Sequence, residues 1–316
     1  MPLIKYQFKS GIDREGTSYT AEGGWYNSDK IRFRSGHPEK IGGWQKYSDS
    51  TFLGSARSLY NYAAASGTHY VGIGTNLKFY ISDGVTYNDI TPIRATTSAG
   101  DVTFSATNGD ATLTVTDASH GAVQGDFVTF SGAATLGGLI TATVLNQEYQ
   151  IATIVNTNSY TVEAKDTDGD TVTANSSDSG NGGSSVVGTY QINTGLDEYV
   201  SGSGWGVSTW GAGGFGSATS LDDTNQLRLY SQDNFGDDLI FCPRLGGIYY
   251  WDQSSGVSTR AVAFSSLGSA SNTPTKCLQI MVSDIDRHII AFGSNPIGSS
   301  TLDPLLVRWS DQESAV

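Results

Sequence analysis

A short apolar strand, a tight turn and a return strand with an aromatic end occur three times in this chain, at residues 69–81, 238–252 and 288–310. Four or five apolar residues run almost without interruption in each unit, as expected of a strand that is buried on both faces. The turns contain Gly, Asn or Pro, which is typical of hairpins. Residues 30–44 have a similar outline and are a candidate fourth copy. Repeated hairpins of this kind are typical of a β-propeller, because each blade must pack against the next.

The composition also favours an all-β fold. Gly is abundant, with 39 residues, and charged residues make up only 16% of the 316. No stretch of 12 or more residues has apolar positions at helical spacing, so we expect helices to be few and short. Aromatic residues make up 11% of the chain, enough for a sizeable core. This composition argues against disorder of the chain as a whole.

Residues 98–194 differ from the rest of the chain. Thr becomes frequent, aromatic residues become sparse, and ten acidic residues stand against a single basic one. Polar and apolar residues alternate strictly in places, as in ATLTVT at 111–116. Such alternation predicts a small antiparallel β-sandwich inserted between two propeller hairpins. The low-complexity segment 175–185 within it predicts a mobile loop.

Three regions follow from these patterns. Residues 1–97 are expected to hold an N-terminal arm and the first propeller hairpins, residues 98–194 the inserted β domain, and residues 195–316 the remaining blades. Without the insert, 219 residues remain, enough for about five blades of roughly 40–45 residues each. The hairpins end in tryptophans that we expect to be buried between blades: Trp44, Trp251 and Trp309.

Charge is divided unevenly along the chain. Residues 1–46 carry eight Lys or Arg against five acidic residues, a net charge of +3, whereas the remaining 270 residues carry a net charge of −16. A body this acidic repels phosphate, which excludes a general nucleic-acid-binding protein. The basic segment predicts docking on an acidic neighbour or on the acidic body itself, with a solvated edge strand as the alternative. Its basic interface candidates are Lys30, Arg32, Arg34 and Lys40.

The sequence shows no catalytic constellation, and we predict neither an enzyme nor a bound cofactor. The four histidines are isolated, and the two cysteines lack metal-site spacing. Cys242 lies inside an apolar run, which indicates a small core residue. No Ser stands in a G-x-S-x-G elbow, and the Asp box of sialidase-type propellers is missing.

Two loops resemble ligand-binding motifs without fulfilling them. Residues 165–171, KDTDGDT, alternate Asp as a calcium loop does, but Gly169 is misplaced and Ser177 stands where a Glu is needed. We interpret this loop as a hairpin turn, with a weak calcium site as the alternative. Residues 195–218 contain a G-x-G-x-x-G pattern that lacks the flanking strand and helix of a dinucleotide site. We expect this loop to pack through Trp205 and Trp210 against a partner or a blade.

Three segments resemble a known family. IRFRSGHPEKIGGW at 31–44, YNDITPIR at 87–94 and LLVRWSDQE at 305–313 are similar to recurrent motifs of the tail-nozzle or "stabilisation" proteins of short-tailed bacteriophages. The insert resembles no family. Members of the nozzle family are usually longer than this chain, which leaves open a shortened member or a part of one.

The resemblance implies a structural protein of the virion. In such tails a ring of propeller-bearing subunits, commonly six-fold, continues the channel of the portal and its adaptor protein, retains the genome and lets DNA leave. The implied partners are other copies of the chain, the adaptor, a tail fibre or tailspike, and DNA that passes without specific binding. No segment predicts membrane insertion. The alternative function is a secreted or surface propeller that binds carbohydrate through exposed aromatic residues.

Overall fold

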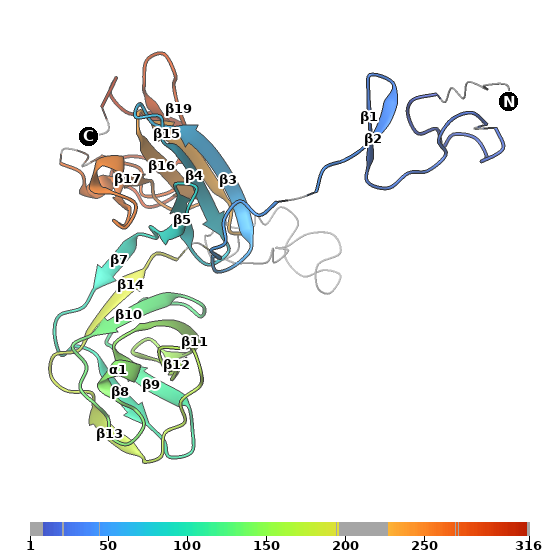
Figure 1. The fold of residues 1–316 in the computed structure, drawn as a ribbon. Helices are drawn as coiled ribbons and strands as arrows, with labels where there is room; N and C mark the ends of the chain where they lie inside the picture. The colour runs from blue at the N-terminus through green and yellow to red at the C-terminus, as the bar shows by residue number, and fades with distance from the viewer. Residues whose placement is uncertain are drawn as a thin grey trace, which may run out of the picture. The chain divides into compact units, whose positions relative to one another are not determined.

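The computed structural model describes the following residues of the chain: 9–20, 22–43, 45–193, 195, 227–268, 270 and 272–314. These residues divide into two compact units, Met1–Tyr47 and Ser48–Val316. Almost all the regular secondary structure of the described residues is β-structure, built of antiparallel sheets (Figure 1). They include one four-residue α-helix, α1 (Ala142–Leu145), and two short 3₁₀ turns, Gln253–Ser255 and Phe264–Ser266. The all-β prediction and the expectation of few, short helices are therefore confirmed.

The first unit, which we call the arm, contains a single β-hairpin among its described residues. Its strands are β1 (Ile31–Arg34) and β2 (His37–Lys40), joined by Ser35 and Gly36. Both turn residues have positive φ, 49° and 82°. This combination is typical of the two-residue turns that match the twist of a hairpin. The candidate fourth hairpin copy thus forms, but in a unit of its own.

The second unit contains three antiparallel sheets in which consecutive strands are neighbours, as in propeller blades. We call these three sheets the body. The first sheet contains β3 (Ala56–Ala63), β4 (His69–Thr75), β5 (Phe79–Ser82) and β6 (Tyr87–Asp89). The second contains β15 (Tyr230–Phe235), β16 (Asp238–Pro243), β17 (Tyr249–Trp251) and β18 (Val262–Ala263). The third contains β19 (Cys277–Val282), β20 (Ile289–Ser294) and β21 (Asp303–Trp309).

The three predicted hairpins are therefore confirmed as β4–β5, β16–β17 and β20–β21. The prediction of about five blades is wrong for the described residues, which form three. The blade count assumed that the arm contributes to the body, whereas the arm is a separate unit. It also counted residues 196–226, which lie outside the described residues.

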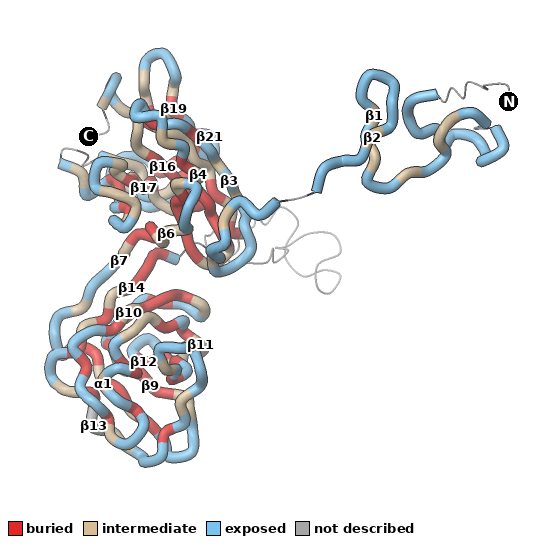
Figure 2. The backbone as a smooth tube through the Cα atoms, in the orientation of Figure 1, coloured by how far each residue is buried: buried red, intermediate tan, exposed pale blue. Residues whose placement is uncertain are grey.

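The second sheet lies between the other two. Strand β15 contacts β3 on one side and β19 on the other, and two apolar clusters fill the two interfaces. Glycines in β4 allow the first interface to be close, because a Cβ on Gly74 would lie 2.3 Å from the Tyr230 ring. At the same interface the rings of Phe79 and Phe241 stack with centroids 3.7 Å apart. In Figure 2 the buried residues, coloured red, lie along the strands of the body.

The tryptophan predictions have different outcomes. Trp251 is 1% exposed, and its indole N–H donates to the Thr259 carbonyl at 3.2 Å, which confirms its burial. The prediction for Trp309 is wrong, because its side chain is 71% exposed. Trp309 lies on the side of the third sheet that no other described sheet covers. Trp44 lies outside the described residues.

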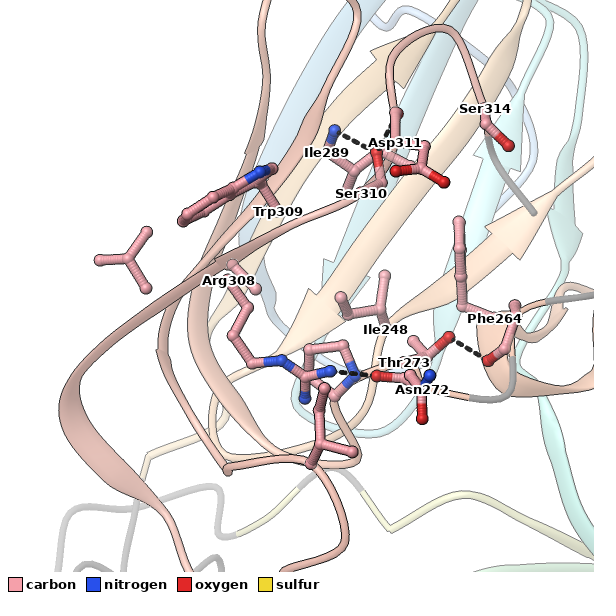
Figure 3. A pocket seen from close by; sticks show the side chains of 15 residues that line it. Ile248, Phe264, Asn272, Thr273, Ile289, Arg308, Trp309, Ser310, Asp311 and Ser314 are labelled. Atoms are coloured by element: carbon pink, nitrogen blue, oxygen red, sulfur yellow. Dashed lines mark hydrogen bonds between the residues drawn. The ribbon is translucent and has the colours of Figure 1, made fainter.

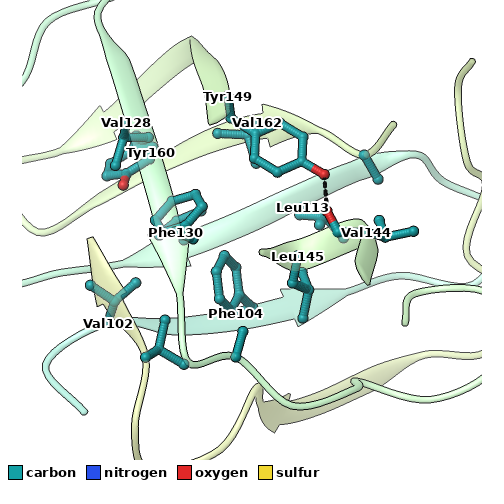
Figure 4. Packing of buried hydrophobic residues seen from close by; sticks show 14 of the residues in the cluster. Val102, Phe104, Leu113, Val128, Phe130, Val144, Leu145, Tyr149, Tyr160 and Val162 are labelled. Carbon is teal, nitrogen blue, oxygen red and sulfur yellow. Dashed lines mark hydrogen bonds between the residues drawn. The ribbon is translucent and has the colours of Figure 1, made fainter. Parts of the chain in front are cut away.

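Residues 93–191 form one antiparallel sheet of eight strands, which we call the inserted sheet. Its long strand β11 contains bulges and pairs with β10 on one side and β12 on the other, so it joins two halves of the sheet. Both halves contribute to one buried cluster, in which Phe104 and Phe130 meet edge to face at 4.9 Å (Figure 4). In order of pairing, the strands are β13 (Asp178–Asn181), β8 (Thr103–Ala106), β9 (Thr112–Thr116), β12 (Ser159–Glu163), β11 (Glu148–Asn156), β10 (Phe127–Ser131), β14 (Val187–Gln191) and β7 (Ile93–Thr96).

This arrangement confirms the antiparallel insert with its own core, and the alternation at 111–116 forms β9. The pairing of β7 with β14 extends the sheet to residue 93, before the predicted boundary. The predicted boundaries at 97/98 and 194/195 stay predictions. The expectation of a mobile loop at 175–185 is wrong for Asp178–Asn181, which form β13 and pair with β8. Backbone groups alone make such a pairing, so a segment of Ser, Gly and Asn can supply an edge strand.

Candidate functional site

The basic hairpin of the arm carries the predicted interface residues on two different faces. Arg32 pairs with Glu39 and Arg34 with His37, so both arginines lie on one face. Lys40 is opposite Ile31 on the other face, and Lys30 precedes β1. Arg32 Nε lies 2.6 Å from Glu39 Oε1. In the sequence these cations form one cluster. In the structure, strand pairing puts them on two faces of the hairpin, and Glu39 neutralises the charge of Arg32.

The arm has no core of its own among its described residues. Every one of them is half-buried or exposed, as Figure 2 shows by the absence of buried colouring there. Its apolar face is small: the rings of Trp25 and Phe33 meet edge to face at 6.1 Å. Ile12, Ile41 and Tyr47 are 48%, 51% and 57% exposed. A two-stranded hairpin without a covering layer is marginally stable at best, so a covering surface would stabilise the arm.

The third sheet presents an apolar face to solvent. Ile280 and Val282 face the second sheet, which turns the alternate residues of β19 outward. In register with them, Met281, Ile290 and Trp309 form one row across the three strands, and Gln279, Phe292 and Val307 form the next. We call this surface, with Leu305, the open blade face. Four of its members are exposed: Leu305 at 90%, Trp309 at 71%, Met281 at 42% and Val307 at 41%.

A pocket of about 460 Å³ lies on the inner side of β21. Apolar side chains line it, among them Ile248, Phe264 and Ile289, and Arg308 lies at its edge (Figure 3). The Arg308 guanidinium donates through Nη1 to the Asn295 carbonyl at 3.0 Å and through Nη2 to the Asn272 carbonyl. Burial lowers the pKa of Arg308 from its usual value. The Trp309 indole points away from this guanidinium, toward the open blade face.

A cluster of four charged side chains joins the inserted sheet to the body. Lys78 Nζ lies 2.8 Å from Asp89 Oδ2 and also contacts Glu148 of β11. Arg260 Nη2 lies 3.2 Å from Asp89 Oδ2 and 3.8 Å from Glu148 Oε2. The Lys78 side chain is only 4% exposed, and its ammonium lies 4.6 Å from the centre of the Phe127 ring. We call this set the junction cluster.

The electrostatics of the junction cluster favour its ionised form. Burial raises the pKa of Asp89, but Lys78, Thr91 and Arg260 lower it further, and the net result is a pKa below the usual value. The two carboxylates are balanced by two cations, and none of the four lines the pocket beside β21. We therefore interpret the cluster as an attachment between domains and not as a catalytic site.

The loop at 165–171 is a turn, as predicted. Asp166 Oδ1 accepts from the backbone N–H groups of Asp168 and Asp170 at 3.0 and 2.9 Å, and Lys165 bridges to Thr171. Gly169 has φ +90°, a conformation that favours glycine. Among the residues that the structure describes, no group of three or more His, Cys, Asp or Glu could hold a metal ion. No described helix is long and apolar enough to cross a membrane.

Sequence reasoning found the basic hairpin but missed the junction cluster and the Arg308 pocket. A single lysine between two apolar strands, in TNLKFYI, was the available signal for Lys78. Glu148 is 70 residues away, so only the fold reveals the pair. The aromatic candidates Trp205 and Trp210 lie outside the described residues.

Comparisons with known proteins do not assign a family. No protein-family model matches the chain, and no curated protein matches it. Among solved structures, the phage phi92 endosialidase aligns over 86% of this chain with a TM-score of 0.24 and 13% identity. This chain spans 40% of that protein. A likeness of this size supports no statement about fold, activity or partners.

Proposed function

We propose that the protein is a structural subunit of a phage tail, part of the nozzle ring that continues the portal and adaptor channel. The observation that carries this proposal is the arm: a basic segment without a core among its described residues, attached to a strongly acidic second unit. Such a segment gains a core by packing on a neighbouring molecule. A protein whose arm is completed by its neighbour is suited to a closed, repeating assembly.

The charge of the body supports passage of DNA without binding. Residues 47–316, which include both the body and the inserted sheet, carry a net charge of −16, so this part of the chain repels the phosphate backbone. The junction cluster would keep the inserted sheet attached while the assembly is under load. On this proposal the protein belongs to the virion. Its partners are other copies of the chain in a six-fold ring, the adaptor, and a tail fibre or tailspike.

Reversal of charge on the hairpin tests this function. Phage carrying Arg32→Glu and Arg34→Glu should yield particles without the ring, which lose their DNA, as seen in electron micrographs of intact particles. The matched control exchanges Arg32→Glu with Glu39→Arg, which retains the 2.6 Å pair in reverse. Rings of normal occupancy in the particles that carry Arg32→Glu and Arg34→Glu would exclude this role for the arm. Turnover of a glycan by the purified chain would contradict the structural assignment altogether.

One observation favours a second candidate, a carbohydrate-binding surface. Trp309 is 71% exposed and lies next to Arg308 and Asp311 at the edge of the pocket. An exposed indole beside polar groups is a surface on which a sugar ring can stack. Binding of the purified chain to a glycan array, lost in Trp309→Ala and retained in Trp251→Phe, would favour this candidate over the first.

A further inference from the structure

The open blade face is an apolar surface that the described sheets leave uncovered. It combines Met281, Leu305, Val307 and Trp309, all exposed, with the half-buried Ile290 and Phe292. The equivalent side of the first sheet is partly covered by its own chain, because Phe52 packs on Tyr80 and Tyr87 there. A face of this kind is where the next layer of a blade stack would pack.

We propose that the arm of a second copy of this chain covers the open blade face. This inference rests on the proposed function and names the surface that receives the arm. The apolar face of the hairpin, with Ile31 and Phe33 beside Trp25, would pack on the rows of Phe292 and Trp309. The arm would thereby gain the core that it lacks, and the third sheet would gain a covering layer.

The charges bordering the open blade face complement the arm. Two arginines of this region lie away from the open blade face: Arg287, in the β19–β20 turn, lies 4.7 Å from the Phe235 ring, and Arg308 of β21 donates to backbone carbonyls beside the pocket. The acidic residues of the same region are exposed. They are Asp284, Asp286, Asp303, Asp311 and Glu313. Exposed acidic residues in the segments that flank the strands of the third sheet attract a segment with a net charge of +3.

The place where the body begins favours a second copy over the same chain. Ser48 Oγ donates to the Val85 carbonyl at the β5–β6 turn, and Phe52 packs on the outer side of the first sheet. The open blade face lies at the opposite end of the three-sheet stack, across about 30 Å at ~10 Å per layer. Residues 41–47 span at most about 25 Å even when fully extended. In a head-to-tail arrangement, the first sheet of one copy instead lies next to the third sheet of another.

Cross-linking between two variants tests the proposal with the full-length chain. Lys40→Cys places a thiol on the apolar side of the hairpin, and Leu305→Cys places one on the open blade face. The native Cys242 and Cys277 are fully buried and do not interfere. The two variants, distinguished by tags of different size, are mixed and oxidised mildly. We expect a mixed disulfide that forms at least tenfold faster than with Leu139→Cys, a 53% exposed control in the inserted domain.

The outcomes separate this inference from the proposed function. Equal rates for Leu305→Cys and Leu139→Cys, or no product, would overturn the arm-to-face contact. A third variant carries both Lys40→Cys and Leu305→Cys in one chain. A disulfide that forms within this chain at high dilution, together with none between the two mixed variants, would show that the arm covers its own body. If cross-linking succeeds but particles show no ring of this protein, the contact stands and the phage assignment fails. If rings form without cross-linking, the function stands and the contact is wrong.

Discussion

Cys242 Sγ lies 3.0 Å from Cys277 Sγ, in the core that joins the second and third sheets. Both thiols are free and fully buried. Burial and the neighbouring Cys277 raise the pKa of the Cys242 thiol well above its usual value. The prediction that Cys242 is a core residue is confirmed, and its partner adds a second sulfur to the same contact between blades.

The buried thiols should be unreactive while the sheets remain packed. Burial slows the modification of both thiols, and because the thiolate is the reacting species, the raised pKa of Cys242 slows its modification further. We expect a maleimide to label neither cysteine in native buffer and both in guanidinium chloride, measured by mass spectrometry. Leu305→Cys, with an exposed thiol, is the positive control. Native labelling of Cys242 as rapid as that of the introduced cysteine would show that the two sheets separate in solution.

Removing the cation from the junction cluster should destabilise the attachment of the inserted sheet. Lys78→Met keeps the aliphatic stem beside Phe127 but leaves Asp89 and Glu148 with Arg260 alone. A loss of about 1–3 kcal/mol in the free energy of unfolding is expected, because a buried ion pair is broken. Urea denaturation measures it. Lys165→Met, in the 165–171 turn, is the matched control, and an equal loss in both variants would contradict the role of the cluster.

The same cluster predicts an acid limit to stability. Asp89 has a pKa below its usual value of 3.8 in the folded protein. A carboxyl of this kind stabilises the fold fully above the unfolded pKa, and its contribution is lost as the pH falls through the lower, folded value. The loss should therefore appear below about pH 4. Asp126 has a raised pKa because of its burial and responds in the opposite sense.

Comparison with Asp89→Asn isolates the first of these two effects. The variant should be less stable than the parent at pH 7, and the two free energies of unfolding should converge as the pH falls below 4. Thermal unfolding at pH 3 and pH 7 measures both. A difference between variant and parent that does not change with pH would assign the stabilisation to packing and not to charge.

The sequence predicted the hairpins well because their signal is local. An apolar run, a turn residue and an aromatic end lie within about 15 residues, and β4–β5 and β16–β17 form where this pattern occurs. Gly72 and Gly74 of β4 are a further local signal in the sequence. They mark the positions where the Tyr230 and Leu239 side chains approach the backbone.

The remaining features depend on contacts between residues far apart in sequence. Strand β13 contains no apolar residue, and its pairing with β8 depends on backbone groups that composition does not reveal. Lys78 and Glu148 meet only because the inserted sheet lies against the first sheet. The basic residues 30–40 were grouped by sequence, whereas strand alternation places Arg32 and Lys40 on opposite faces.

The two described tryptophans at hairpin ends should behave oppositely on truncation. Trp251→Ala removes a ring that is 1% exposed and that contacts Tyr70 at 5.5 Å, so a loss of about 3–5 kcal/mol is expected. Trp309→Ala removes a ring that is 71% exposed, and the free energy of unfolding of the isolated chain should change by less than about 0.5 kcal/mol. Denaturant unfolding at low protein concentration separates the two. Self-association, measured by sedimentation, should weaken in Trp309→Ala, because this ring belongs to the open blade face. A large loss of stability in the dilute Trp309→Ala chain would mean that its own arm or another part of the same chain covers that face.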